Sequence, residues 1–195
     1  MQHLTRDQLM SLEQYTERRA DFRQQVIDHK KHRRVGIGPH LNLYIEDRLT
    51  VQYQVQEMLR IERIFEPAAI EEELETYNPL IPDGGNLKCT AMLEYQDVEQ
   101  RKAQLAQLKG IENQVWLQVE GFDPVYAIAN EDLERSNEEK TSAVHFMRFE
   151  LEPEMIDALH SGAALSLGVE HDLYRHQTTV TGDTRTALLA DLSTS

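Results

Sequence analysis

Residues 50–65 have the sequence TVQYQVQEMLRIERIF, whose periodicity predicts a helix enclosed by protein on most of its circumference. At about 100° per residue, Val51 and Val55 lie on one apolar stripe, and Glu62 falls between them. Glu57 lies on a second apolar face of the same helix. We therefore expect a central helix that carries two carboxylates into the protein interior.

An enclosed carboxylate needs an ion pair, hydrogen bonds, a metal ion or a proton. For Glu62 the sequence leaves two interpretations open. One is an internal ion pair with an arginine such as Arg34, Arg48 or Arg148, and the other is a ligand or acid–base role at a pocket. Glu57 and Glu62 point about 140° apart, so we do not expect them to chelate one ion.

Two histidines complete the candidate chemistry. His145 lies in the largely apolar segment 144–147, and His171 ends a predicted strand. With Glu62 they define the hypothesis of a metal-dependent enzyme, because imidazole and carboxylate groups bind zinc and iron. No spacing demands a cofactor, and residues 57–60 (EMLR) have arginine where a di-iron bundle has histidine. The candidate buried polar cluster comprises Glu57, Arg60, Glu62, His145 and His171.

The rest of the chain predicts an α+β fold in a single domain, residues 1–195. A long amphipathic helix is expected over residues 5–32, and the polar segment 131–142 is expected to be a loop. Alternating patterns predict about five to six strands in an antiparallel or mixed sheet, packed against the long helix and the central helix. The predicted strands are 41–45, 87–95, 115–119, 125–129, 144–151 and 165–171, and shorter helices follow Pro67, Asp97, Pro153 and Thr184.

The charge of the chain narrows the classes of partner. Twenty basic residues against 34 acidic ones give a net charge of −14, which disfavours nucleic acid and anionic membranes as partners. The single cysteine, Cys89, makes no internal disulfide, and residues 1–7 lack the apolar core of a secretion signal. We therefore expect a cytoplasmic protein.

One basic run, HKKHRR at residues 29–34, stands out in so acidic a chain. It follows the predicted first helix, so its charges complement the negative end of that helix and pair with nearby acids. A second interpretation is that it binds an anion or an acidic partner. The residues of this candidate surface are Lys30, Lys31, Arg33 and Arg34.

Several segments together resemble an uncharacterised bacterial family, a conserved domain of unknown function. They are RRV (33–35) with Gly38, YIEDR (44–48) with Thr50, QVQEMLRIERI (54–64), YNPLIP (77–82), VHF (144–146) and HDLY (171–174). The resemblance implies no established activity. It implies a setting, because such proteins tend to be encoded near rubrerythrin-like and iron–sulfur oxidoreductase proteins.

Two hypotheses of function follow. The first is a non-enzymatic accessory or binding protein in a redox or oxidative-stress setting, with a protein partner or, through the stripe of the first helix, a homodimer. The second is the metal-dependent enzyme built on Glu62, His145 and His171.

Overall fold

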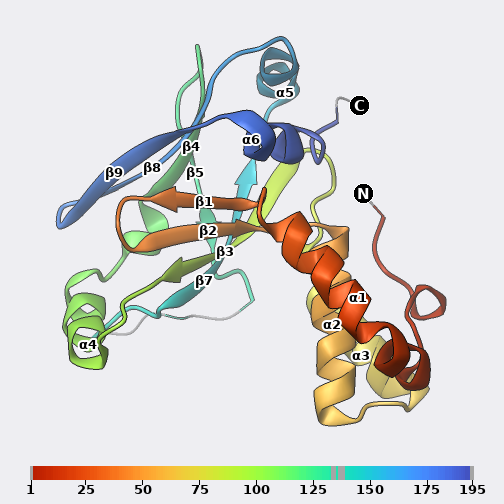
Figure 1. Ribbon diagram of the computed structural model, residues 1–195. Helices are drawn as coiled ribbons and strands as arrows, with labels where there is room; N and C mark the ends of the chain where they lie inside the picture. Colours follow the sequence, from red (N-terminus) through yellow and green to blue (C-terminus); the bar gives the residue numbers. More distant parts are fainter. Residues whose placement is uncertain (1, 133–134, 136–138, 194–195) are drawn as a thin grey trace.

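Two β-sheets and a group of helices that projects from them make up the molecule (Figure 1). The structure, a computed structural model, describes residues 2–132, 135 and 139–193. The α-helices are α1 Leu12–Lys30, α2 Arg48–Glu62, α3 Pro67–Tyr77, α4 Val98–Gln107, α5 Pro153–His160 and α6 Gly182–Leu189. Short 3-10 helices span Arg6–Gln8, Asn78–Leu80 and Ile111–Asn113. The strands are β1 Arg34–Ile37, β2 Leu41–Ile45, β3 Asn86–Leu93, β4 Val115–Val119, β5 Val125–Tyr126, β6 Ile128–Ala129, β7 Val144–Glu150, β8 Leu165–His171 and β9 Tyr174–Val180.

The strands form two antiparallel sheets. Sheet A has the order β1-β2-β3-β7-β6, and sheet B has the order β5-β4-β8-β9. Side chains alternate across β3, so that Leu87, Cys89 and Ala91 are buried in the core while Lys88 and Met92 lie on the opposite face. The inner faces of the two sheets thus share the larger hydrophobic core, and sheet A has an outer face turned away from it.

Tyr174 joins the sheets along one side, at the start of β9. Its hydroxyl donates to the carbonyl oxygen of Ile37 at 2.7 Å and accepts from the N–H groups of His40 and Leu41. The turn between β1 and β2 is therefore held against the edge of sheet B.

On the opposite side of the molecule, residues 125–130 form hydrogen bonds with both sheets. The N–H of Ala127 donates to Val115 of β4, and the N–H of Asn130 donates to Phe146 of β7. Residues 125–130 therefore cross from sheet B to sheet A and place Ile128 and the following loop at the edge of β7.

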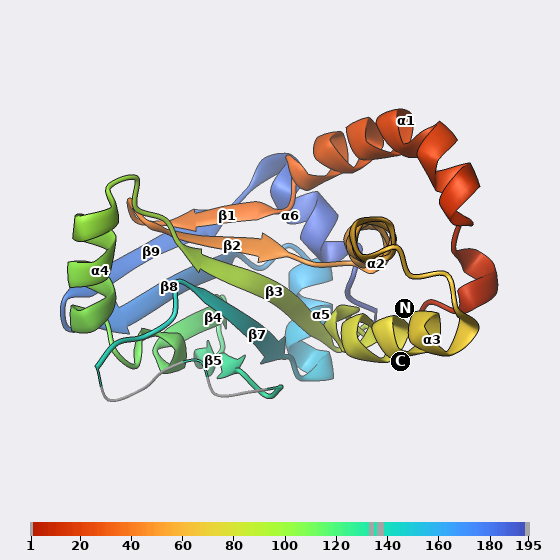
Figure 2. The same cartoon turned by 90° about the horizontal axis from the view of Figure 1, so that it is seen from below.

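Helices α1, α2 and α3 form an arm that extends beyond the sheets (Figures 1 and 2). Ser11 caps α1 by accepting from the N–H of Gln14, and Asp47 caps α2 by accepting from the N–H of Thr50 at 2.9 Å. The arm has a hydrophobic cluster of its own, separate from the core between the sheets. Its buried members are Leu4, Val51, Val55, Leu59, Leu74 and Ile81.

The α+β class is confirmed, but the arrangement differs from the one expected. Among the described residues, nine strands in two sheets replace the predicted single sheet. The sequence patterns did not reveal β1 and β9, and the strand predicted over residues 125–129 is divided into β5 and β6. Four of the five residues between Tyr174 and Val180 are exposed, so β9 lacks the apolar alternation that marks a half-buried strand. The first helix packs on the central helix, and the central helix packs on α3 instead of on a sheet.

The arm and α4 lie at opposite ends of sheet A, with α5 and α6 packed near the junction with the arm (Figure 2). Within the described ranges, no helix has the length and apolar character that a membrane span requires. The assignment of the whole chain to one domain stays a prediction.

Candidate functional site

Glu57 lies in the seam between α1 and α2, with 13% of its side chain exposed. Its carboxylate accepts from the Tyr15 hydroxyl at 2.6 Å, from Arg19 at 2.7 and 3.0 Å, and from Arg60 at 3.1 Å. The hydrogen bond from Arg19 is the main reason that the pKa of Glu57 falls to about 2, against the opposing effect of burial. Glu57 is therefore an ionised structural acid that ties α1 to α2.

Glu62 is exposed, which corrects the expectation that it is enclosed. It is the last residue of α2, and Arg63 then adopts a left-handed conformation with φ 55° that ends the helix. The buried stripe of α2 accordingly stops at Leu59, while Ile61 and Phe65 are 62% and 68% exposed at the tip of the arm. Glu62 needs no internal partner.

His145 is buried on β7, and both of its ring nitrogens have hydrogen-bond partners. Nδ1 faces the side chain of Asn130 at 3.0 Å, and Nε2 lies 2.9 Å from the Thr141 hydroxyl and 3.0 Å from the carbonyl oxygen of Ser142. Burial lowers the pKa of His145, although the carboxylate of Glu112 opposes this shift from 4.0 Å. His145 is therefore a neutral, hydrogen-bonded histidine with a structural role.

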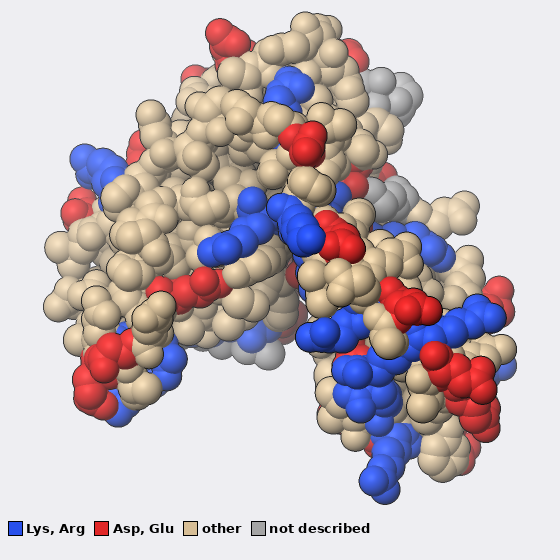
Figure 3. Space-filling model, viewed as in Figure 1, with Lys and Arg blue, Asp and Glu red and all other residues tan. Residues whose placement is uncertain are grey.

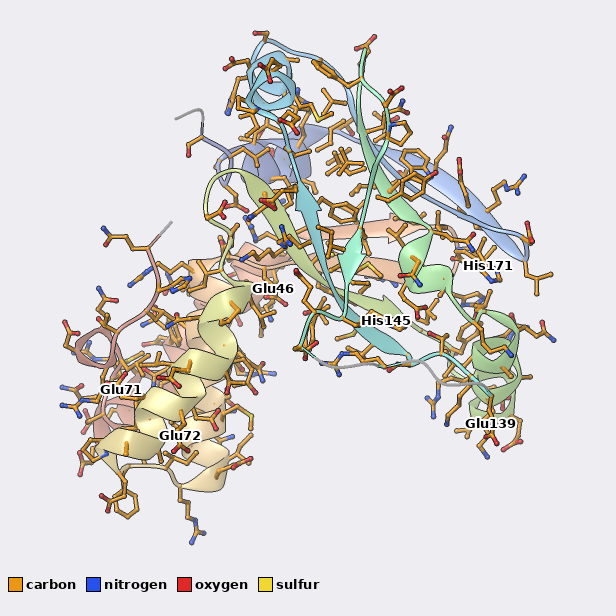
Figure 4. The ribbon with its side chains drawn as sticks, turned by 180° about the vertical axis from the view of Figure 1, so that it is seen from behind. Glu46, Glu71, Glu72, Glu139, His145 and His171 are labelled. Atoms are coloured by element: carbon orange, nitrogen blue, oxygen red, sulfur yellow. The ribbon has the colours of Figure 1, made fainter. Side chains whose placement is uncertain are left out.

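His171 ends β8, where its Nε2 lies 3.2 Å from the carbonyl oxygen of Lys109 and its Nδ1 accepts from the N–H of Leu173. His145 and His171 come from different elements and lie away from the arm that carries Glu62 (Figure 4). In the part of the chain that the structure describes, no three histidine, cysteine or acidic side chains are placed to hold a metal ion. The three residues of the metal-enzyme hypothesis do not come together.

Arg33 is buried, which removes it from the candidate surface formed by the basic run. With its side chain 3% exposed, it pairs with Asp191 and lies 3.5 Å from Asp47. It also donates to the carbonyl oxygens of Ile45 at 3.1 Å and Ala187 at 3.3 Å. Arg33 therefore joins β2, the start of α2 and the C-terminal helix, a structural role that the basic pattern alone did not distinguish.

The other three residues of the candidate surface, Lys30, Lys31 and Arg34, lie at the surface of the protein in different surroundings. The Lys30 ammonium lies 5.8 Å from the centre of the Tyr53 ring, and Lys31 pairs with Asp28. Arg34 donates to the side chain of Asn42 at 3.0 Å on the outer face of sheet A. Their role as an anion-binding or partner-binding surface stays a prediction.

The outer face of sheet A is a concave surface with two hollows. Figure 3 shows the molecule hollowed between the arm and the lobe that carries α4. A cavity of about 610 Å³ lies where this face meets the end of α3, and we call it the outer-face cavity. Its apolar lining consists of Tyr77, Pro79, Leu80, Ile128, Phe146 and Met147.

A second hollow of about 670 Å³ lies further along the same face, beside α4. Its lining includes Arg34, Asn42 and Glu94, which already bond to one another: Arg34 donates to Asn42, and Asn42 donates to Glu94 at 3.0 Å. The outer-face cavity, with its larger apolar wall, is the better candidate for a binding site.

Two arginines of the outer-face cavity are held by carboxylates. Arg148 makes two hydrogen bonds to Glu131, at 2.8 and 3.0 Å, and these lower the pKa of Glu131. Arg135 pairs with Asp132 and stacks its guanidinium 4.6 Å from the centre of the Phe146 ring. The positions of both guanidinium groups are thus fixed before any ligand binds.

Lys88 is held differently. Its Nζ donates to the carbonyl oxygens of Pro79 at 2.8 Å and Ile81 at 3.0 Å, which connects β3 to the chain that follows α3. These two bonds use two of the three donors of an ammonium group.

Sequence patterns alone did not identify this cavity. Alternation places Lys88, Phe146 and Arg148 on the face of β3 and β7 opposite to the core, but it does not say what stands over that face. The remaining wall comes from the end of α3 and from the loop after β6, which are distant in sequence. No periodicity links such segments.

Comparison with known proteins identifies the family of the chain. The model of a family described as a protein of unknown function, DUF3501, matches residues 3–192. The chain belongs to the DUF3501 family. This agrees with the resemblance to a family of unknown function noted from the sequence. A search of curated proteins finds no match.

The fold of this DUF3501 protein is similar to a crystal structure of a novel protein of unknown function from Burkholderia pseudomallei. The two share 50% sequence identity and superpose with a TM-score of 0.93, over 98% of this chain and 100% of the other. Neither comparison names a ligand or a reaction, so the proposal of function rests on the site itself.

Proposed function

We propose that this DUF3501 protein is a non-enzymatic binding protein that holds a small, largely apolar ligand in the outer-face cavity. The main observation that supports this proposal is the cavity itself. At about 610 Å³ it lies within the range of about 300–1,000 Å³ that small-molecule sites occupy. Like those sites, it combines a mainly apolar wall with a few fixed polar groups.

The chemistry of the wall favours binding over catalysis. Its arginines are engaged with carboxylates, and a guanidinium group stays protonated in proteins, so it does not act as an acid or a base. Glu131 is held ionised by Arg148 and is thereby disfavoured as a general acid. These groups are suited to orienting a ligand.

The position of the cavity also supports an accessory role. It is bounded by the arm on one side and by sheet A on the other, so a bound ligand contacts both parts of the protein. We also propose a cytoplasmic location, as expected from the single cysteine, and a redox setting, as the sequence resemblance implies. The accessory role comes from the first of the two hypotheses.

The test uses an uncharged apolar dye, N-phenyl-1-naphthylamine, whose fluorescence rises on entering an apolar site. The wild-type protein should give a saturable rise. Ile128→Trp fills the cavity from an edge strand where the side chain is 41% exposed, and it should weaken dye binding about tenfold.

Leu173→Trp is the matched control, since it makes a similar change at a turn residue that is 64% exposed and remote from the cavity lining. It should leave dye binding unchanged. The proposal fails if the dye does not bind the folded wild-type protein, or if both tryptophan variants bind it as the wild type does.

A further inference from the structure

We infer that the ligand of the outer-face cavity is an apolar molecule with one carboxylate, and that Lys88 binds this group. The inference rests on the proposed function and adds the chemical class of the ligand. Its starting point is the charge environment of Lys88, which differs from that of both arginines in the same wall.

The Lys88 ammonium is positioned but not neutralised. Lys88 lies on the outer face of β3, opposite Arg148 of β7 in the strand register. Its two hydrogen bonds go to uncharged carbonyl oxygens, of Pro79 and Ile81. Among the described residues, no carboxylate lies within 4.0 Å of its Nζ. By contrast, Arg135 pairs with Asp132, and Arg148 pairs with both Glu131 and Glu150.

Glu131, whose pKa Lys88 influences, already pairs with Arg148. Lys88 contributes to the lowered pKa of Glu131, but the hydrogen bonds from Arg148 are the leading cause. Both oxygens of Glu131 accept from Arg148. The third donor of Lys88 is therefore left for a group that enters the cavity.

A second polar group of the wall favours the same class of ligand. The buried Nε of Arg135 has no hydrogen-bond partner among the described residues. The wall thus has an unused donor besides that of Lys88, while Glu131 and Asp132 already accept from arginines. A ligand group that only accepts hydrogen bonds, such as a carboxylate, complements these donors.

The two acids also set the charge of the ligand. Glu131 and Asp132 lie in the same wall and pair with Arg148 and Arg135, whereas Lys88 has no such pair among the described residues. One negative charge on the ligand therefore matches the charge of Lys88. A ligand cation, in turn, faces Lys88 and two arginines. An apolar chain or ring ending in one carboxylate fits both the wall and its charge.

The experiment measures displacement of N-phenyl-1-naphthylamine by three probes with the same chain length: decanoate, decanol and decylamine. At about pH 8, decanoate is ionised and decylamine is protonated. Wild-type protein should prefer decanoate to decanol by about tenfold, the usual magnitude for a hydrogen bond to a charged group. Decylamine should bind more weakly than decanol.

Three variants separate the role of Lys88 from a general effect. Lys88→Met should reduce the preference for decanoate to about twofold or less while leaving decanol affinity within about twofold. Lys88→Arg keeps the charge and should retain most of the preference. Lys102→Met, on the exposed face of α4, should behave as the wild type.

The outcomes distinguish this inference from the proposed function. If the dye and decanol bind but decanoate has no advantage, or keeps its advantage in a folded Lys88→Met variant, the carboxylate assignment is wrong and the binding function stands. Should Lys88→Met fail to fold, Lys88→Arg and the wild-type preference decide: absence of a decanoate advantage in both overturns the inference. If the dye does not bind the wild type, both proposals fall.

Discussion

Replacing Arg33 by methionine tests the corrected interpretation of the basic run. Methionine keeps most of the hydrocarbon volume and removes the guanidinium, so the loss is ionic and not a cavity. Its side chain is 3% exposed, and the paired side chains of Asp191 and Asp47 are 4% and 10% exposed. The substitution leaves these acids with little compensation and removes a donor from the carbonyl oxygens of Ile45 and Ala187.

The expected loss of unfolding free energy is about 3–5 kcal/mol, the range for removal of one partner of a buried ion pair. Summing the individual hydrogen bonds would exceed this range, because the side chains that remain adjust. His29 stays 2.5 Å from Asp47 and supplies part of the compensation. For a chain of this size, such a loss corresponds to a decrease in melting temperature of about 6–20 °C.

The size of the loss should depend on pH. Burial raises the pKa of Asp191 to about 6, even though Arg33 opposes the shift. A raised pKa in the folded state gives stability that is present at low pH and lost as the pH rises through that value. Without Arg33 the pKa rises further, so Arg33→Met should be less destabilising at about pH 5 than at about pH 8.

Urea denaturation followed by circular dichroism measures both effects. Arg34→Met is the matched control, because Arg34 is 53% exposed and its loss should cost about 1 kcal/mol or less. Asp191→Asn in the Arg33→Met background should recover part of the stability at about pH 8 by removing the unpaired charge. Equal effects of Arg33→Met and Arg34→Met, or no dependence on pH, would refute the assignment of Arg33 as a buried structural cation.

Three further outcomes are expected. Glu57→Gln should cost about 1–3 kcal/mol of unfolding free energy, whereas Glu62→Gln should stay within about 0.5 kcal/mol; similar costs in urea denaturation would contradict their different surroundings. Because the pKa of Glu57 is lowered to about 2, its stabilising contribution is present above about pH 4.5 and lost as the pH falls toward 2. Acid titration of the wild type should therefore show a loss of about 1–2 kcal/mol that is absent from Glu57→Gln, after allowance for solvent screening. Finally, a methyl group added at Gly168 would lie 2.1 Å from the ring of Trp116, so Gly168→Ala should cost about 1–3 kcal/mol and change the fluorescence of the single tryptophan, and an unchanged emission spectrum would count against this contact.

The elements with strong periodicity could be predicted from the sequence, and those with weak periodicity could not. β2 and β8 have buried residues at alternating positions along most of their length, and both were expected. By contrast, β1 contains Gly36 and lies at the edge of sheet A, and β9 is mostly exposed and lies at the edge of sheet B. Edge strands bury little on one side, so their composition is close to that of a loop.

Glu57 and Glu62 show when projection of a helix predicts the burial of a side chain and when it does not. Projection assumes that a helix continues and that its apolar side is covered along its full length. For Glu57 both assumptions hold, and its partners Arg19 and Arg60 lie on α1 and α2. For Glu62 they fail, because Arg63 ends the helix in a left-handed conformation that sequence does not mark with glycine.

The outer-face cavity could not be predicted because it depends on tertiary arrangement. Its floor consists of outward residues of β3 and β7, such as Lys88 and Phe146, which resemble ordinary solvent-facing positions. Its wall requires the end of α3 to lie beside that face, which no local pattern encodes. The sequence analysis selected buried polar residues as candidate site residues. Those whose contacts the structure shows, including His145, have a structural role.

A crystal structure of the protein grown with decanoate would show directly whether Lys88 binds the carboxylate of a ligand. We expect density for the ligand in the outer-face cavity, with its carboxylate within about 3.2 Å of the Lys88 Nζ and its chain against Phe146 and Ile128. Decanoate bound elsewhere, or bound in this cavity with its carboxylate directed to solvent away from Lys88, would contradict it.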